Sequence, residues 1–514
     1  MNGAESLVRT LVDSDVTVCF SNPGTSEMHF VAALDKVPQM RPVLTLFEGV
    51  ATGAADGYAR MTGRPAATLL HLGPGLANGL ANLHNARRAS VALVNIVGDH
   101  ATYHGPYDAP LTSDVAGFAR PVSGWVHSCT SARSTGADAA RAVQAARSAP
   151  GQIATLILPA DTAWNEAEGA SPALPVATAA PVADAAIERG VEALRSGRRT
   201  ALLMRGEALQ AVGLEAAGRI AETTGCRLLC DTFAPRLDRG AGRVTVERIP
   251  YFAEQIVEFL GDLEQLVLVD AKPPVAFFAY PDKPSWVLPS DCKVLCLAQD
   301  FEDGPEALTG LAEALGKAGK PARLQPLVRP ERPTGKFNAF TIGAAIAHLL
   351  PEGAIFSDDG ATSSGGTMQA TIGAPAHTHL ALTGGAIGQG LPLAVGAAVA
   401  CPDRKVICLS GDGSGMYTLQ ALWTMAREQL DVTTVVFANR SYKILNVELG
   451  RVGAGEPGPA ALSMLDLSNP NLDWAGLARD LGVESSRAET LEQFMDQFAG
   501  AMRGHGPRLI EALI

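Results

Sequence analysis

The feature of this sequence that most constrains its fold is a short apolar run, rich in Val, Ile and Leu, that recurs along the chain. Polar or glycine residues end each run, and a helical pattern follows. The runs occupy residues 42–47, 66–71, 91–99, 153–159, 200–205, 226–231, 266–270, 293–298, 354–359, 405–412 and 433–439. Strands that are apolar throughout are buried on both faces, as in parallel sheets covered by helices. The sequence therefore predicts an α/β fold of doubly wound parallel sheets.

Two proline-rich stretches divide these runs into three groups. Residues 167–183 are rich in Ala and Pro, and residues 317–336 are basic and rich in Pro, which is typical of exposed connections between domains. At about 150 residues per domain, a chain of 514 residues also suggests three domains. We expect three consecutive α/β domains, at residues 1–168, 184–320 and 336–514.

Composition and charge exclude several classes of protein. With 47% hydrophobic and 18% charged residues, the chain is unlike a disordered protein. Its 41 Lys and Arg against 53 Asp and Glu give a net charge of −12 without a long basic run, which makes it a poor nucleic-acid binder. No apolar run approaches the roughly 18 residues that span a bilayer. The first residues lack a basic region followed by an apolar stretch, so we expect a cytoplasmic protein without a signal peptide.

The eight cysteines are expected to be free thiols, as is usual in a reducing compartment. Cys226 and Cys230 are four residues apart in a predicted strand, and so are Cys292 and Cys296. On a strand such residues share a face but lie about 13 Å apart, too far to bind one metal ion. We therefore expect buried thiols rather than a metal or redox site.

Polar residues follow two predicted strands of the last segment. The sequence Gly-Asp-Gly-Ser-Gly, at residues 411–415, comes at the end of one strand, and Asn439 comes at the end of the next. Ligands bind outside the carboxyl ends of parallel strands, so Asp412 and Asn439 are expected to face one crevice. Carboxylate and amide oxygens suit Mg²⁺. The glycine-rich backbone, with a helix predicted over residues 417–429, suits a diphosphate.

This motif differs from two common nucleotide-binding patterns. No Gly-Lys-Ser/Thr follows it, so it is not a P-loop, and Met416 stands where a dinucleotide fingerprint has its third glycine. Gly-Asp-Gly alone is also a common turn. The metal-site interpretation rests on Asn439 following Asp412 by 27 positions, the length of one strand–helix–strand unit.

The segment GDGSGMYTLQALWTMAREQLDVTTVVFANRSY resembles the metal–diphosphate motif of thiamine diphosphate (ThDP) enzymes, in the branch of acetolactate synthase and benzoylformate decarboxylase. The resemblance implies that Asp412, Asn439 and the backbone carbonyl of Ser441 bind Mg²⁺. It also implies that further residues of the motif bind the cofactor, namely Gly411, Gly413, Ser414 and Tyr442. The family often has Asn-Asn or Asn-Asn-Gly where this chain has Ala-Asn-Arg, with the ligand Asn kept.

Glu48 begins the segment EGVATGAADGYARMTGRP, which resembles the family's Glu followed by a Gly- and Ala-rich helix and Asp-Gly-Tyr-Ala-Arg. In the family this carboxyl group shares a proton with the distant ring nitrogen of the cofactor's aminopyrimidine. That proton favours the imino tautomer, which removes the reactive C2 proton. Taken alone, Glu48 also has a structural interpretation, because a Glu in a first helical turn interacts favourably with the helix dipole.

The segments NPGTSE (22–27) and HLGPGLANG (71–79) resemble the family's loops at the reacting end of the cofactor. The resemblance implies a proton-shuttling His71, a hydroxyl contribution from Thr25, and Asn78 facing the pyrimidine. The structural alternatives are a neutral His71 hydrogen-bonded to backbone at a strand end, and a Thr25 that caps a helix.

The segment TGGAIGQGLP (383–392) looks like the family loop that bends the cofactor into its V shape. The resemblance implies that Ile387 wedges between the two rings and that the Gly385 carbonyl accepts from the cofactor's amino group. Ser363 and Ser364, after the run 354–359, are expected to donate to the diphosphate. Without the resemblance, Ile387 would simply be a core residue.

The sequence says less about the substrate. Residues 273–285 contain no His, although benzoylformate decarboxylase has its second active-site His in the comparable stretch, which weakens an aryl substrate. The flavin and substrate-Arg segments of acetolactate synthases are not found either, so FAD is possible but unsupported. Glu448 lies where related enzymes place substrate-pocket residues. His100 and His104 are candidates for lining the same mouth, or are simply solvated.

The resemblance implies a ThDP- and Mg²⁺-dependent enzyme that cleaves a 2-oxo acid and releases CO₂. The product is an aldehyde or, after capture by a second carbonyl compound, an acetolactate-type compound. It also implies a homodimer or homotetramer in which Glu48 of one chain serves the cofactor held by Asp412 of another. The alternatives are a non-decarboxylating ThDP lyase or hydrolase, an inactive regulatory subunit, and an NAD-linked oxidoreductase. The intact Glu48 disfavours the regulatory subunit, and the failed dinucleotide fingerprint disfavours the oxidoreductase.

Overall fold

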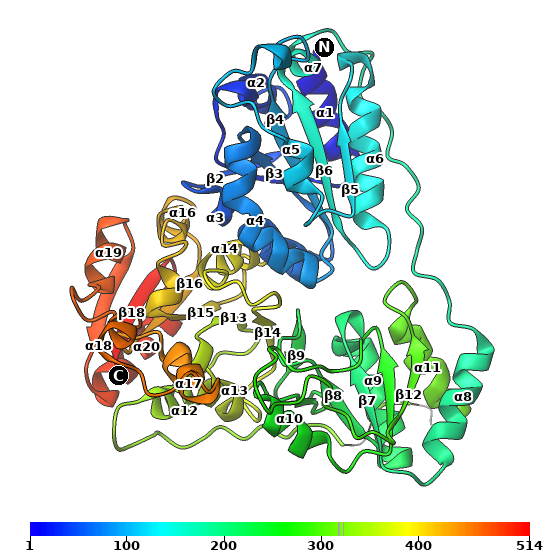
Figure 1. Ribbon diagram of the computed structural model, residues 1–514, viewed down its shortest axis with the longest axis vertical. Helices are drawn as coiled ribbons and strands as arrows, with labels where there is room; N and C mark the ends of the chain where they lie inside the picture. The colour runs from blue at the N-terminus through cyan, green and yellow to red at the C-terminus, as the bar shows by residue number, and fades with distance from the viewer. Residues whose placement is uncertain (317–318, 322) are drawn as a thin grey trace.

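The computed structural model describes residues 1–316, 319–321 and 323–514, and it contains three sheets (Figure 1). The first sheet lies at the top of Figure 1, the second at the lower right and the third at the lower left. This arrangement confirms the predicted α/β fold with three parallel sheets. The eleven runs predicted as strands all contain strands of the structure.

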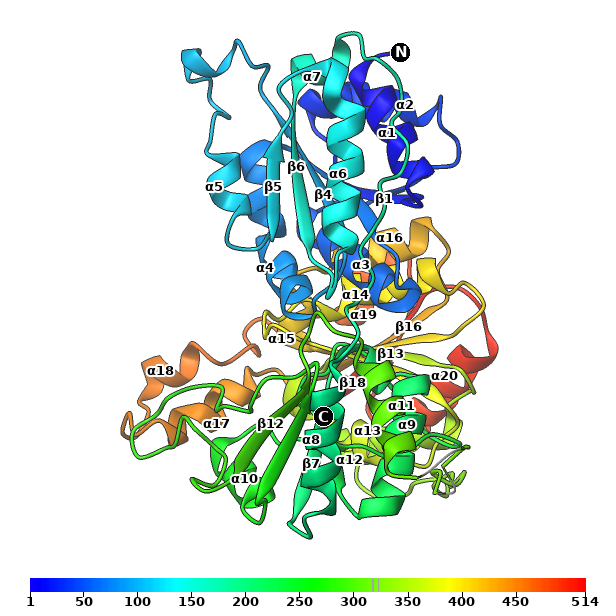
Figure 2. The same ribbon diagram turned by 90° about the vertical axis from the view of Figure 1, so that its right-hand side faces the viewer.

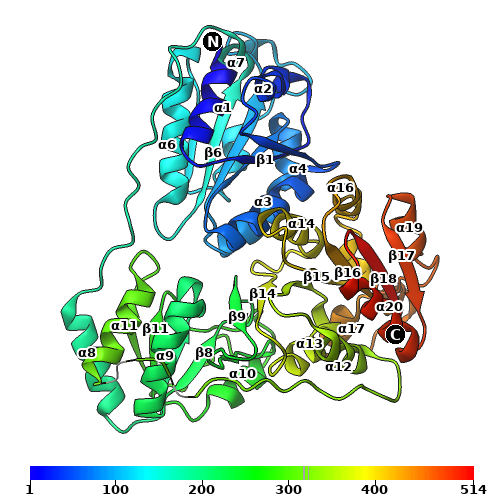
Figure 3. The same ribbon diagram turned by 180° about the vertical axis from the view of Figure 1, so that it is seen from behind.

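The first sheet has the all-parallel strand order β2-β1-β3-β4-β6-β5. Its strands are β1 (Val18–Ser21), β2 (Arg41–Leu44), β3 (Ala66–Leu70), β4 (Leu93–Asp99), β5 (Trp125–Ser128) and β6 (Ile153–Pro159), and its helices are α1 (Gly3–Asp13), α2 (Met28–Leu34), α3 (Glu48–Thr62), α4 (Leu72–Arg88), α5 (Val115–Ala119), α6 (Thr135–Arg147) and α7 (Ala160–Trp164). Helices α1 and α6 cover one face, and α3 and α4 cover the other (Figure 3). Successive strand residues alternate between the two cores, since Phe20 packs with α3 and Cys19 with α1.

The second sheet is smaller, with the order β10-β8-β7-β11-β12. Its strands are β7 (Thr200–Met204), β8 (Arg227–Cys230), β10 (Glu247–Arg248), β11 (Gln265–Val269) and β12 (Lys293–Ala298), and its helices are α8 (Asp184–Arg195), α9 (Ala211–Thr224), α10 (Ala253–Leu260) and α11 (Gly304–Ala314). Helices α8, α9 and α11 cover one face, and α10 covers the other. All eight cysteines are free, including the two pairs on and beside these strands.

The third sheet has the order β17-β18-β16-β15-β13-β14-β9. Its strands in chain order are β9 (Leu237–Arg239), β13 (Ile355–Asp359), β14 (His377–Ala381), β15 (Val406–Gly411), β16 (Val432–Ala438), β17 (Glu484–Ala488) and β18 (Arg508–Leu513). Its helices are α12 (Ala339–Leu349), α13 (Gly365–Ala370), α14 (Gly390–Ala400), α15 (Asp412–Gly415), α16 (Ala421–Arg427), α17 (Lys443–Arg451), α18 (Pro459–Ser463), α19 (Trp474–Asp480) and α20 (Leu491–Arg503). Strand β9 comes from the central part of the chain and pairs antiparallel with β14. It was not expected from the sequence.

The structure differs from the sequence-based expectation at the helix after the Gly-Asp-Gly motif. A continuous helix was predicted over residues 417–429, but the short α15 begins at Asp412 and α16 begins only at Ala421. The bend brings Thr418 under the neighbouring loop, where its hydroxyl donates to the Gly388 carbonyl at 2.7 Å. The amides nearest the motif are therefore those of α15.

The two proline-rich stretches contain no helix or strand where the structure describes them, although Ala180 forms an isolated bridge with Glu302. The first runs down the side of the molecule from the first sheet to α8 (Figure 2). Of the second, residues 317–318 and 322 lie outside the described residues. Within the described part of the chain, no helix has the length and apolar character needed to cross a bilayer.

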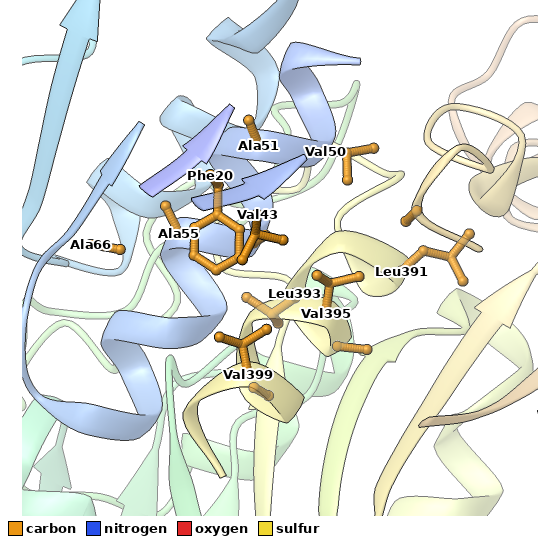
Figure 4. Close-up of a cluster of buried hydrophobic side chains, with 14 of the residues drawn as sticks. Phe20, Val43, Val50, Ala51, Ala55, Ala66, Leu391, Leu393, Val395 and Val399 are labelled. Atoms are coloured by element: carbon orange, nitrogen blue, oxygen red, sulfur yellow. The ribbon is translucent and has the colours of Figure 1, made fainter. Parts of the chain in front are cut away.

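Helices α3 and α14 join the first and third parts of the chain through one continuous hydrophobic core (Figure 4). Glycines allow the two backbones to touch, because a Cβ on Gly57 would lie 2.1 Å from the Leu393 carbonyl oxygen and one on Gly396 would lie 1.8 Å from that of Ala54. The glycines of the α3 segment therefore serve helix packing as well as any cofactor.

A buried ion pair fixes the same contact. Arg60 donates two hydrogen bonds to Asp56, each 2.7 Å long, and Gln389 donates a third at 2.6 Å. Arg60 also donates to the carbonyls of Pro235 and Ala381. One guanidinium thus ties α3 to the central and third parts of the chain.

Candidate functional site

The proposed metal ligands lie at the ends of adjacent strands. Strands β15 and β16 are parallel neighbours, with Asp412 directly after the first and Asn439 directly after the second. The Asp412 carboxylate is buried and accepts from the amides of Arg440, at 2.6 Å, and Gly413, at 2.9 Å. Burial raises the pKa of Asp412, and these amide hydrogen bonds oppose that rise. The Asp412 carboxylate therefore links the loop after β15 to the loop after β16.

The second loop turns sharply directly after Asn439. Arg440 has a left-handed backbone with φ +56°, and the Asn439 side-chain oxygen accepts from the Ser441 amide at 3.0 Å. The Ser441 carbonyl accepts from the Lys443 amide at 2.8 Å. Carboxylate, amide and carbonyl oxygens are the donor types that suit a hard cation such as Mg²⁺.

Among the described residues, no cluster of three or more His, Cys, Asp or Glu has metal-binding geometry. Tyr442 closes the loop over Gly413, where a Cβ would lie 2.4 Å from the tyrosine ring. Ser414 is buried one residue further on, and a Cβ on Gly411 would lie 3.4 Å from its hydroxyl oxygen.

The loop at residues 383–390 is held by a residue that the sequence reasoning missed. Asp359, at the end of β13, is buried and accepts from the amides of Gly388 at 2.7 Å and Gly390 at 3.3 Å. Burial raises the pKa of Asp359 to about 7 although these amides oppose the rise. The sequence did carry a signal for this residue, because Asp359 directly follows Asp358 at the end of a predicted strand.

Asp359 leaves the front of this loop free for a ligand. Gly385 has φ +76° with open space where a Cβ would stand, and Ile387 is only partly buried. Ser363 and Ser364 are buried just after the same strand, at the start of α13.

Glu48 is the first residue of α3, and its side chain is held by α4. Asn78 donates to Glu48 Oε2 at 3.0 Å, and Gly75 lies against Oε1. Glu48 is only 7% exposed. The structure thus brings together two residues that lie 30 positions apart in the sequence and that were both predicted as site residues.

His71 lies at the start of α4 beside a buried acid that the sequence reasoning also missed. Glu27 Oε2 lies 2.9 Å from His71 Nδ1 and accepts from the Gly24 amide at 2.7 Å. Room for this acid comes from Gly98, where a Cβ would stand 1.7 Å from Glu27 Oε1. Thr25 is exposed, and its hydroxyl has no hydrogen-bond partner among the described residues.

His100 and His104 lie near Glu27 and His71, beside Ser26, which contacts both of those residues. Their rings are 5.2 Å apart, and they line a cavity of about 230 Å³ together with Ser26, Tyr103 and Trp164.

Glu448, on α17, instead lies against the central part of the chain. Its carboxylate interacts with Tyr280 and lies 3.6 Å from Arg451, which pairs in turn with Glu254. The stretch 273–285, which contains no His, therefore places a tyrosine, Tyr280, against Glu448.

The chain matches two family models. Residues 1–114 match the model described as thiamine pyrophosphate enzyme, N-terminal TPP binding domain, and residues 360–512 match the corresponding C-terminal TPP binding domain. Both matched ranges contain candidate site residues, Glu48 and His71 in the first and Asp412 and Asn439 in the second.

Relatives that match this chain over nearly its full length point to the same family. The chain is 53% identical over 515 residues to the "Putative acetolactate synthase large subunit IlvX" of Mycobacterium tuberculosis, covering 100% of this chain and 99% of the relative. It is 28% identical to a benzoylformate decarboxylase of Pseudomonas aeruginosa, over 96% of each chain. A solved thiamine diphosphate-dependent 4-hydroxybenzoylformate decarboxylase of Rhodococcus jostii has the same fold, with a TM-score of 0.86, 24% identity, and coverage of 100% of this chain and 99% of that one. The chain belongs to the thiamine diphosphate enzyme family, as the sequence motifs predicted.

Proposed function

We propose that this protein is a ThDP- and Mg²⁺-dependent enzyme that decarboxylates a 2-oxo acid. The product leaves as an aldehyde or is joined to a second carbonyl compound. The observation that carries this proposal is the buried Glu48 carboxyl group, fixed by Asn78. The names of the relatives, acetolactate synthase and benzoylformate decarboxylase, agree with these two outcomes.

Residues of the third part of the chain would hold the cofactor's diphosphate and metal. Asp412, Asn439 and the Ser441 carbonyl supply three oxygens toward Mg²⁺, and the metal offsets the charge of an anionic group bound to an acidic protein. The amides of α15 and the hydroxyls of Ser363 and Ser364 are the donors for the phosphate oxygens.

The first part of the chain would handle protons. When bound, ThDP would supply a nucleophilic carbon and an electron sink for the bond that is broken when CO₂ is released. Glu48 shares a proton with the distant pyrimidine nitrogen, and Asn78 keeps its carboxyl group in place. Glu27 accepts from His71 Nδ1–H, which leaves Nε2 to exchange a proton with the reacting substrate. FAD has no role in this scheme.

We also propose that each active site is shared between two copies of the chain, in a homodimer or homotetramer. Within one chain, Glu48 is held by Asn78, whereas the loop expected to shape the cofactor is held by Asn85, which bonds both polar atoms of the Ala386 backbone. Seven residues separate these two asparagines on α4, about 10 Å along the helix. Glu48 and the cofactor loop of the same chain thus contact α4 two turns apart, which favours a loop supplied by a second copy.

The cytoplasmic location and the domain limits at 1–168, 184–320 and 336–514 remain part of the proposal. Strand β9 departs from these limits, because residues 237–239 fall within the proposed central domain 184–320 but belong to the third sheet.

The proposal is tested by supplying the purified protein with ThDP and Mg²⁺ and screening pyruvate, longer aliphatic 2-oxo acids and benzoylformate for CO₂ release. Products are analysed for aldehydes and for acetolactate-type compounds. Glu48→Gln should lower CO₂ release about 10²- to 10⁴-fold while ThDP still binds. Equal activity in the variant would refute the role of Glu48. ThDP binding by the wild type without CO₂ release from any acid would favour a non-decarboxylating enzyme or a regulatory subunit.

A further inference from the structure

A second cavity, of about 290 Å³, lies between the central and third parts of the chain. Its walls come from β9 and β10 and the loop between them, from Gln325, and from α13 and the turn after it. Strand β9 sits beside β14 in both views that show it, with β8 on its other side (Figures 1 and 3). None of the lining residues belongs to the proposed ThDP and Mg²⁺ site.

Two arginines line this cavity, and neither has a carboxylate partner among the described residues. Arg239 donates to the Met368 backbone carbonyl at 2.8 Å and contacts the Met368 sulfur. The Arg248 side chain has no hydrogen-bond or ion-pair partner in the part of the chain that the structure describes. Both side chains are partly buried. Arginine in such a position is normally paired with an acid, because an unpaired charge away from water is costly.

The acids nearby are committed to other groups. Glu247 also lines the cavity, but its two carboxylate oxygens accept from Arg227, each at 3.0 Å. Asp238 accepts from Thr378 at 2.9 Å and pairs with Arg236. Among the described residues, the cavity is therefore left with two positive charges and no unpaired negative charge to balance them.

The electrostatics of neighbouring groups agree with this excess. Burial, and then the charge of Arg248, lower the pKa of Arg239 to about 10. Burial and the charge of Arg239 lower the pKa of His377, which pairs with Arg239 across the strands, to about 3. His377 is therefore neutral at physiological pH and adds no further positive charge.

We propose that this cavity binds a small organic anion, whose carboxylate or phosphate group is held by the guanidinium groups of Arg239 and Arg248. Two planar guanidiniums suit the paired oxygens of such a group. The remaining wall is partly apolar, with Leu237, Val246 and Ile372, so the anion carries a compact apolar body. The cavity volume fits a ligand at the small end of the usual range for binding pockets. This site is independent of the proposed reaction.

Equilibrium dialysis of the full-length protein tests the proposal. The protein is first saturated with ThDP and Mg²⁺, so that the cofactor site cannot take up the probe. Labelled orthophosphate, benzoate and adenosine monophosphate are the probes, and they distinguish a bare phosphate, an apolar carboxylate and a phosphate ester. We expect benzoate or adenosine monophosphate to bind at one molecule per chain, more tightly than orthophosphate, with a Kd below 1 mM, which corresponds to a binding free energy of about −4 kcal/mol or lower.

Arg248→Gln should weaken that binding at least tenfold. Arg243→Gln is the matched control, because Arg243 lies on the loop between β9 and β10 but does not line the cavity. It should bind like the wild type. Arg239→Gln, checked for folding by circular dichroism, should also weaken binding, and Arg248→Gln decides alone if that variant is unfolded. Absence of binding by every probe, or unchanged binding by Arg248→Gln, would overturn the proposal. Loss of decarboxylase activity would not affect it.

Discussion

The first and third parts of the chain share a parallel α/β architecture but hold their candidate site groups in different ways. In the first part, side chains fix side chains, as Asn78 fixes Glu48 and Glu27 fixes His71. In the third part, backbone amides fix side chains, as at Asp412 and Asp359. Groups held by side chains suit proton transfer, because their partners also titrate or reorient. Groups held by amides suit the fixed binding of a charged cofactor.

This comparison predicts its largest effect at the metal loop. Asp412→Ala removes a proposed Mg²⁺ ligand and the link between two loops, so ThDP affinity should fall about 100-fold or more, which is about 2.7 kcal/mol. Glu48→Gln should change that affinity far less, since it acts on proton transfer. Titration calorimetry with ThDP and Mg²⁺ measures both. Asp403→Ala, on an exposed turn before β15, is the control. Equal losses in the Asp412 and Glu48 variants would break the division between binding and proton chemistry.

A second prediction concerns the acid that positions His71. Glu27→Gln should lower kcat about 10- to 100-fold and shift the pH profile of kcat, because the imidazole loses its charged partner. ThDP affinity should stay near that of the wild type. Ser26→Ala is the milder control in the same turn, since Ser26 contacts both groups. If both variants showed the same pH profile as the wild type, Glu27 would have only a structural role.

The contact between the two parts gives a third prediction, on stability. Gly57→Ala would place a methyl group against the Leu393 carbonyl, so the α3–α14 contact should weaken by about 1–3 kcal/mol. Gly450→Ala, in α17, meets nothing within 4 Å and should be neutral or stabilising by up to about 1 kcal/mol. Thermal unfolding of the two variants distinguishes helix packing from helix propensity. A Gly57 variant as stable as the wild type would show that the helices can separate without loss.

The fourth prediction is a pH dependence at Asp359. Its pKa in the folded protein, about 7, lies above the ordinary value of 3.8, so the folded state binds a proton more tightly than the unfolded state. Stability should therefore fall as the pH rises from about 4 to about 7. Asp359→Asn cannot lose a proton and should gain in thermal midpoint relative to the wild type over that range. Asp403→Asn is the exposed control. A constant difference between Asp359→Asn and wild type at all pH values would contradict the shift.

Much of the fold and of the site was predictable because both depend on local patterns. The short apolar runs predicted buried parallel strands, and the ends of two of these strands lie side by side at Asp412 and Asn439, since β15 and β16 are neighbours. The short strand β9 was not predictable, because three residues between loops show no period. Glu27 and Asp359 were missed because each acts through contacts with segments far away in the sequence, such as the partnership of Glu27 with His71.

The sequence by itself determined the class of fold and the cofactor family, because these depend on residue types at fixed local spacing. Only the tertiary structure decided which acids hold which groups, and that two arginines are left without an acid beside α13. The physical reason is that charge balance and burial depend on what the folded chain brings within a few ångströms. Arg239 and Arg248 lie on different strands, β9 and β10. Glu247, the acid next to Arg248 in the cavity wall, is already paired with Arg227, and no local sequence pattern reveals this.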